Sequence, residues 1–209
     1  GQYTEDCHPR NTLRHRRETL DSGRWLPPYN ALNGLSLRLA NRAYQFINGS
    51  LKKEALIGVY DMFFPFASWQ AYIDAYGSKG FIEHQVLIPS EQIFAYLSEF
   101  GKLHKKFDVS IGLATIKMFD GEQRFLRFVG KGISFAIHIA ANAKALAFLD
   151  ELDRLDINHQ SIANIIKDSR VPGSVIREQY KEFDLMRTMI TQHDPDRLFS
   201  SALSRRIGL

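Results

Sequence analysis

The sequence is poor in the residues that build disulfides, zinc sites and membrane spans. Its 209 residues include a single cysteine, Cys7, which excludes an internal disulfide framework and a cysteine zinc site. No run of 18 apolar residues occurs, so we expect no membrane-spanning helix. The segment Gly1 to Arg17 is polar and basic, which predicts no signal peptide. We therefore predict a cytoplasmic protein and leave association with a membrane surface open.

Several catalytic and ligand-binding motifs are also missing. The sequence holds neither Gly-x-Gly-x-x-Gly nor Gly-x-x-x-x-Gly-Lys-Ser/Thr, so it offers no loop of the kind that cradles phosphates. It has no His-Glu-x-x-His pair and no Gly-x-Ser-x-Gly elbow, which are typical of zinc proteases and serine hydrolases. The seven histidines show no metal-ligand spacing, and we predict no metal site.

Positive charge is concentrated in one part of the chain. The net charge is +4, and Gly101 to Lys131 alone holds seven lysines and arginines against three acidic residues. Nucleic acid is one possible partner for such a patch, but no recognisable nucleic-acid-binding motif accompanies it. An anionic cofactor or substrate accounts for the charge equally well. We therefore predict no nucleic-acid partner.

Hydrophobic periodicity predicts one folded domain behind an irregular start. Residues 1–29 show little periodicity and contain a Pro-Pro pair near their end, which indicates a tail or the remnant of a preceding domain. Residues 30–209 form the predicted domain. Over residues 80–167 the expected order is strand, helix, strand, strand, helix, strand. This order is typical of a split βαβ, ferredoxin-like α+β fold, in which an antiparallel sheet carries helices on one face.

The individual elements of this domain are predicted as follows. Alternation and turn residues predict strands over 80–89, 109–119 and 162–166, one or two further strands over 124–129 and 133–140, and an extended run over 56–66. Helical spacing predicts helices over 32–46 with Asn30 as cap, 69–76, the segment after Ser90, 143–155, 172–191 and 196–206. We expect Phe94 and Leu146 among the helix side chains that face the core.

Four polar residues interrupt the apolar strands: Glu83, Gln85, Lys117 and His138. Glu83 and Gln85 are two residues apart, so they point to the same side of their strand. These residues either line a functional pocket or lie on a solvated sheet face, and the pattern alone favours the solvated face. For His138 taken alone, the pattern favours a structural histidine over a ligand or base.

Several short segments of the chain resemble, in the same order, those of one enzyme family. Ile165–Arg170 resembles the Lys-Asp-Ser-Arg motif of FAD-linked oxidoreductases of the vanillyl-alcohol oxidase type, with the decaprenylphosphoryl-ribose oxidase branch as the closest. Further segments resemble that branch: Phe63–Phe66 with Trp69 and Tyr76-Gly77, the strand Gly80–Pro89, Ile116–Phe119, and Asp194–Phe199 with Arg205–Leu209. The resemblance covers about residues 30 to 209. Each motif is short, and their order and spacing together carry the resemblance.

The resemblance implies a two-part enzyme of which this chain is the C-terminal, substrate-binding (cap) part. An FAD-binding domain, upstream or in a separate chain, would hold most of the cofactor. The substrate would be a sugar-like or sugar-alcohol-like small molecule, or a lipid-linked one, oxidised at a CH–OH group. The chain alone would be inactive. The alternative is a non-catalytic binding domain that retained the fold.

The same resemblance implies roles for individual residues. Lys117 would be catalytic and would contact the flavin. The implied substrate-binding residues are Glu83, Gln85 and His138. The implied cofactor-binding residues are Lys117, Lys167, Asp168 and Arg170. For the last three, a purely structural role at the domain junction is an equal alternative, because paired aspartates and arginines often lock loops.

Overall fold

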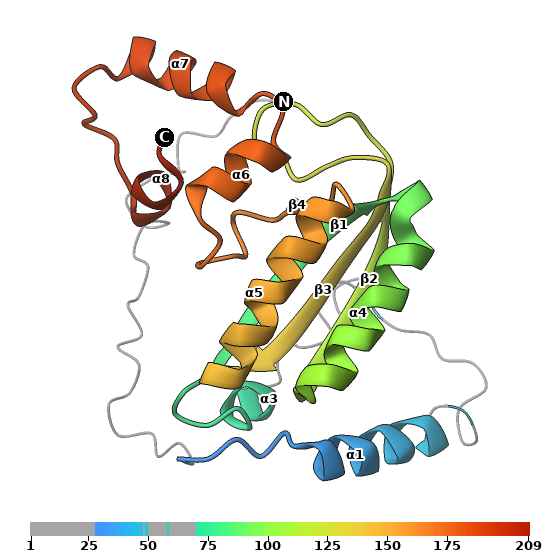
Figure 1. The fold of residues 1–209 in the computed structure, drawn as a ribbon. Coiled ribbons are helices and arrows are strands. Elements are labelled where there is room, and N and C mark those ends of the chain that lie inside the picture. The colour runs from blue at the N-terminus through green and yellow to red at the C-terminus, as the bar shows by residue number, and fades with distance from the viewer. Residues whose placement is uncertain (1–27, 48, 50–57, 59–69) are drawn as a thin grey trace, which may run out of the picture.

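The computed structural model describes residues 28–47, 49, 58 and 70–209 (Figure 1). The predicted tail, the extended run over 56–66 and the resemblance at Phe63–Trp69 thus lie almost entirely outside the described residues. The strands are β1 (Phe81–Pro89), β2 (Ile111–Phe119), β3 (Gly132–Ala140) and β4 (Ile162–Ala163). The helices are α1 (Gly34–Phe46), α3 (Gln70–Asp74), α4 (Ile93–Phe107), α5 (Ala143–Asn158), α6 (Gly173–Gln179), α7 (Phe183–His193) and α8 (Ala202–Ile207), and a short 3₁₀ turn, η2 (Ser90–Gln92), precedes α4.

The predicted α+β fold is confirmed. Within the described residues the strands form one sheet in the order β2-β3-β1-β4, and every neighbouring pair is antiparallel. Helix α4 connects β1 to β2, helix α5 connects β3 to β4, and both helices lie on the same face of the sheet (Figure 1). This is the split βαβ arrangement with helices on one face.

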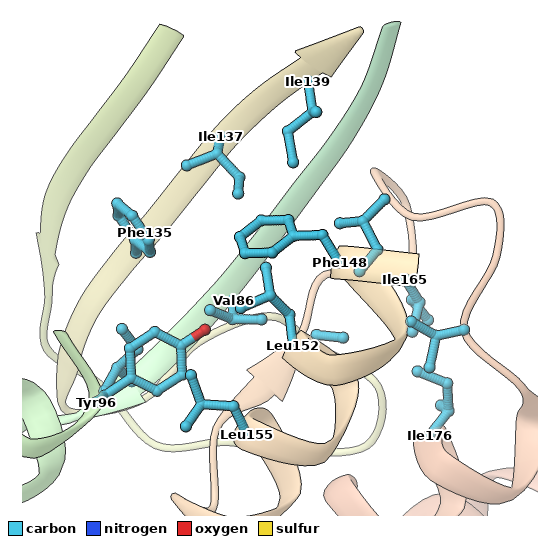
Figure 2. Close-up of a cluster of buried hydrophobic side chains, with 14 of the residues drawn as sticks. Val86, Tyr96, Phe135, Ile137, Ile139, Phe148, Leu152, Leu155, Ile165 and Ile176 are labelled. Carbon is cyan, nitrogen blue, oxygen red and sulfur yellow. The ribbon is translucent and has the colours of Figure 1, made fainter. Parts of the chain in front are cut away.

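The core fills the space between this face of the sheet and the two helices. Val86 and Ile88 of β1 and Ile137 of β3 point into it and are fully buried, as alternation along each strand requires. Phe148 and Leu152 of α5 lie directly over these strands (Figure 2). The opposite face of the sheet carries polar side chains as well as the buried residues Leu87, Ser134 and Ala136.

A glycine fixes the end of the central strand pair. Gly132, the first residue of β3, pairs with Pro89 at the end of β1. A Cβ atom at position 132 would lie 2.0 Å from the carbonyl oxygen of Ile88, which no side chain can accommodate without moving the backbone. Glycine at this position thus allows the two strands to approach closely up to their last pair.

Two predicted helix residues do not face the core. Phe94 is 89% exposed and Leu146 is 44% exposed. Both belong to helices whose apolar stripe lies about one residue away from them. In α5 the buried stripe consists of Ala145, Phe148, Leu149, Leu152 and Leu155, and Leu146 lies beside it.

Of the one or two strands predicted over 124–129 and 133–140, only the second segment is a strand (β3), and 124–129 is a loop. The backbone N–H of Phe125 donates to the Glu182 carboxylate at 2.7 Å, and Arg124 lies 3.6 Å from the other oxygen of the same group. Phe125 has a φ of +51°, which is incompatible with a strand. The distant acidic side chain thus decides the conformation of this segment.

The last predicted helices are also shorter than expected. The helix over 172–191 divides into α6 and α7, because Tyr180 leaves the helical conformation and donates its hydroxyl to the carbonyl of Ala163 at 2.7 Å. The Asp194 carboxylate accepts the N–H groups of Leu198 and Phe199, and this turn delays α8 to Ala202. At the other end, Asn33 rather than Asn30 caps α1.

Some smaller boundaries also differ. The strand predicted over 162–166 covers only Ile162 and Ala163, and α3 is shorter than the predicted 69–76. None of the described helices combines the length with the apolar character that crossing a bilayer requires.

One buried phenylalanine, Phe148, and one exposed phenylalanine, Phe94, provide a test of this packing. We expect Phe148→Ala to lower the free energy of unfolding by about 3 to 5 kcal/mol, because it removes a fully buried ring and leaves a cavity. The matched variant Phe94→Ala, at an exposed site on α4, should change it by less than about 0.5 kcal/mol. Urea unfolding followed by circular dichroism measures both. Equal losses in the two variants would contradict this description of the core.

Candidate functional site

The register of the sheet collects the polar strand residues on the face opposite α4 and α5. Glu83 of β1 pairs with His138 of β3, and Lys117 of β2 pairs with Ser134 of β3. Directly paired residues point to the same side of a sheet. The polar face is therefore defined by Glu83, Gln85, Lys117, Ser134 and His138.

A chain of polar contacts crosses one end of this face. The Tyr76 hydroxyl lies 2.7 Å from the Tyr72 hydroxyl, which lies 2.9 Å from Nδ1 of His138. Nε2 of His138 faces Oε2 of Glu83 at 3.9 Å, and Nζ of Lys167 lies 3.3 Å from the same oxygen. The carboxylate of Glu83 thus lies between two nitrogen groups that come from different parts of the sequence.

A second set of contacts fixes Gln85. Its amide nitrogen donates to the Ser134 hydroxyl at 2.8 Å, and its amide oxygen accepts from Asn164 at 2.9 Å. The backbone N–H of Asn164 also donates to the Gln85 carbonyl at 2.8 Å. The nitrogen and the oxygen of the Gln85 side-chain amide therefore each have a partner, and the side chain is held in one orientation.

The charges of this site follow from these contacts. The contact with His138 lowers the pKa of Glu83, burial opposes this shift, and Lys167 adds to it, so the carboxylate is ionised at neutral pH. Burial raises the pKa of Tyr72 and that of Tyr76 above the usual value, so both hydroxyls keep their protons. Lys117 is exposed and forms no ion pair within the part of the chain that the structure describes.

Four residues of this site were missed by the sequence predictions: Tyr72, Tyr76, Ser134 and Asn164. Tyr72 belongs to α3, Tyr76 lies in the turn that follows this helix, and Asn164 follows β4. Their contacts join residues that are 49 to 79 positions apart, apart from the Tyr72–Tyr76 pair. No local sequence pattern predicts such contacts, although alternation along β3 does place Ser134 on the same side of the strand as His138.

The side chains of the Lys-Asp-Ser-Arg segment point to two different parts of the structure. Lys167 reaches the polar face, whereas Asp168 is buried and accepts the N–H groups of Arg170 and Val171 at 2.7 and 2.6 Å. Arg170 forms a two-pronged ion pair with Asp153 of α5 at 2.5 and 2.7 Å. The guanidinium of Arg206 in α8 donates to the carbonyls of Asp168 and Val171. Asp168 and Arg170 therefore connect this loop to α5 and α8.

A buried ionic cluster lies on the other side of β1. His84 and Asp156 lie 3.3 Å apart, and their ligand atoms and one of Asp153 lie within 4.8 Å of one another. Burial lowers the pKa of His84, but the two carboxylates outweigh it and raise that pKa above the usual value. The guanidinium of Arg170 occupies both oxygens of Asp153 and supplies the positive charge. These contacts favour a structural ionic network over a metal site.

Curated proteins that are similar to this chain in sequence include the following two. It is 28% identical to the decaprenylphosphoryl-β-D-ribose oxidase of Mycolicibacterium smegmatis over 145 residues, which cover 69% of this chain and 31% of the oxidase. Its sequence is related to that of an oxidase. It is also 32% identical over 90 residues to an uncharacterized protein in the mprA 5′ region of Streptomyces coelicolor, covering 43% and 24% of the two chains. The chain thus spans less than a third of each relative, and no family model matches it.

The donor groups of the polar face fit the ring end of a flavin. A flavin ring presents carbonyl oxygens and ring nitrogens along one edge, and these accept hydrogen bonds. Lys117 and Lys167 offer ammonium donors, and Lys117 has no ionic partner among the described residues that would compete. The sequence has no glycine-rich loop for the pyrophosphate, so these residues suit the ring and not the whole cofactor.

The divided motif leads to the first prediction about this site. We expect Arg170→Met to lower the free energy of unfolding by about 3 kcal/mol, because it leaves the largely buried Asp153 carboxylate unpaired. The neighbouring variant Lys167→Met removes only a half-exposed ammonium and should cost less than about 1 kcal/mol. Chemical denaturation of both variants measures the difference. A larger loss in Lys167→Met than in Arg170→Met would contradict the assignment.

The lowered pKa of Glu83 leads to a second prediction, on pH dependence. Because the folded-state pKa lies below the unfolded one, its stabilisation is complete above about pH 5 and is lost as pH falls through the folded pKa. Urea unfolding of wild type and Glu83→Gln should therefore converge between about pH 5 and pH 3. The exposed-site control Glu91→Gln should leave the acid profile of the wild type unchanged. A Glu83→Gln profile that parallels the wild type throughout would contradict the shift.

Proposed function

We propose that this chain is the C-terminal, substrate-binding part of an FAD-dependent oxidoreductase that acts on a CH–OH group of a sugar or sugar-alcohol-like substrate. The observation that carries the proposal is the polar face, where an ionised carboxylate, an ordered amide and two ammonium groups gather on one side of the sheet. Similarity to an oxidase supports the same reaction class.

The chemistry of these groups suits a hydroxylated substrate. A carboxylate accepts hydrogen bonds from hydroxyl groups, and the amide nitrogen of Gln85 has a second hydrogen to donate besides the one bonded to Ser134. Glu83, Gln85 and His138 are therefore the proposed substrate-binding residues. A bound lipid-linked sugar would present the same hydroxyls, with its lipid outside the described contacts.

Lys117 is the proposed catalytic residue. A bound flavin supplies the electron acceptor for the hydride that leaves the carbinol carbon. An ammonium group near that reaction stabilises the negative charge that develops on the oxygen or on the flavin edge. Lys117 is suited to this because it is exposed on the polar face and no described carboxylate neutralises it.

Lys167 is the second proposed cofactor-contacting residue, since it reaches the same face. Asp168 and Arg170 contribute to the cofactor site through the position of this loop, because their own charged groups engage α5 and α8. The proposed partner is an FAD-binding domain, upstream or in a separate chain, which holds most of the cofactor.

The proposal predicts which activities require the cofactor domain: FAD binding and reduction of the flavin by substrate. The purified 209-residue chain should be colourless and should bind FAD weakly or not at all in a fluorescence titration. Together with the flavin-binding domain, fused or added as a separate chain, it should support reduction of the flavin by a sugar alcohol. If the combined protein binds FAD but no hydroxylated substrate reduces it, the non-catalytic binding domain becomes the better description.

Removal of the Lys117 charge tests the catalytic assignment. We expect Lys117→Met to slow flavin reduction by about 30-fold to 1,000-fold, as for the loss of one preorganised charge donor, with little change in stability. Stopped-flow reduction and thermal melts measure the two effects. The control Lys102→Met lies on α4, on the opposite face, and should reduce its flavin at the wild-type rate. The same rate in Lys117→Met would remove this residue from the site.

A further inference from the structure

His138 is held on three sides by residues of the polar face and its rim. Its ring stacks on Phe81, with 4.7 Å between ring centroids. Nδ1 faces the Tyr72 hydroxyl at 2.9 Å, and Nε2 faces the Glu83 carboxylate at 3.9 Å. The two ring nitrogens therefore meet chemically different neighbours, a phenol on one side and a carboxylate on the other.

The direction of the hydrogen bonds follows from the inner tyrosine. Tyr76 is 2% exposed, and among the described residues its hydroxyl contacts that of Tyr72 at 2.7 Å. A buried hydroxyl proton needs an acceptor, so Tyr76 donates to the oxygen of Tyr72. Nδ1 of His138, at 2.9 Å, is then the described acceptor for the proton of Tyr72. This leaves the proton of a neutral imidazole on Nε2.

We propose that Tyr72 and Tyr76 are positioning residues that fix His138 in the tautomer with its proton on Nε2, directed at Glu83. The two tyrosines and the histidine form a chain of donors whose last N–H points toward the carboxylate, 3.9 Å away. Lys167 approaches the same oxygen from the other side. Neither ring of the tyrosine pair needs to contact the substrate for this role.

The tautomer matters for what the site recognises, and this step rests on the proposed function. An imidazole with its proton on Nε2 donates toward Glu83 and leaves the carboxylate as the hydrogen-bond acceptor of the site. A substrate hydroxyl that donates to Glu83 then meets a single fixed arrangement. With the opposite tautomer, the lone pair on Nε2 would face the carboxylate and would repel it.

Long-range proton–nitrogen NMR of the histidine-labelled 209-residue chain tests the tautomer without flavin or substrate. Spectra are recorded at about pH 9, well above the ordinary histidine pKa. In the wild type we expect Nε2 of His138 to carry the proton with at least tenfold preference. In Tyr72→Phe the ratio should fall at least threefold, toward the mixture of a free histidine, because Glu83 is too distant for a strong hydrogen bond. Tyr76→Phe should shift it in the same direction by less.

His159 provides the internal control in the same spectra. It contacts Gln92 and Glu99 on the helix side of the sheet, and its signals should be identical in all three proteins. Unchanged His159 signals and a normal thermal melt show that a variant is folded. A proton on Nδ1 of His138 in the wild type, or an unchanged tautomer ratio in folded Tyr72→Phe, would overturn the proposal.

The consequence for recognition is measured separately on the combined oxidoreductase. Tyr72→Phe should raise the KM for a sugar alcohol about threefold to tenfold and change kcat less. A shifted tautomer with an unchanged KM would overturn the positioning role. Because the NMR experiment contains neither flavin nor substrate, its failure leaves the proposed oxidoreductase function standing. Failure of that function leaves the NMR result standing.

Discussion

Side chains alternate along a strand, so a shift of one residue between β1 and β3 would exchange the two faces of the sheet. The observed register, with Glu83 opposite His138 and Val86 opposite Phe135, settles both faces at once. It buries Val86 and Phe135 against the helices and places Glu83 and His138 on the other side. The core and the candidate site are therefore two results of one strand pairing, and neither can change without the other.

The buried ionic cluster supports this register from behind the sheet. His84 lies between Glu83 and Gln85 in sequence and points into the helix layer, where it meets Asp156 of α5. Arg170 then joins the neighbouring Asp153 to the loop that carries Lys167. Such a network costs desolvation, but once formed it has few alternative geometries. It thereby couples β1, α5 and the Lys167 loop, the parts that deliver charged groups to the polar face.

Patterns within a single strand or helix were sufficient for most of the fold. Alternation predicted β1, β2 and β3, and it placed Lys117 on the side opposite Ile116 and Met118. It failed where a distant side chain decides the backbone, as Glu182 does for the loop at Phe125. The contact between Tyr72 and His138 could not be predicted from the sequence either, because it depends on how a short helix packs against the rim of the sheet. The site roles themselves remain proposals.

The arrangement of charge explains why a ferredoxin-like sheet suits the proposed role. Helices α4 and α5 pack on one face, and the half-buried Glu83 and His138 and the exposed Lys117 lie on the other. On that face the carboxylate of Glu83 contacts Lys167, while Lys117 has no ionic partner among the described residues. The polar face thus carries an excess of positive charge beside an ordered hydrogen-bond acceptor. Such a surface complements the proposed ligand pair, a hydroxylated substrate beside a flavin ring that takes on negative charge as it accepts electrons.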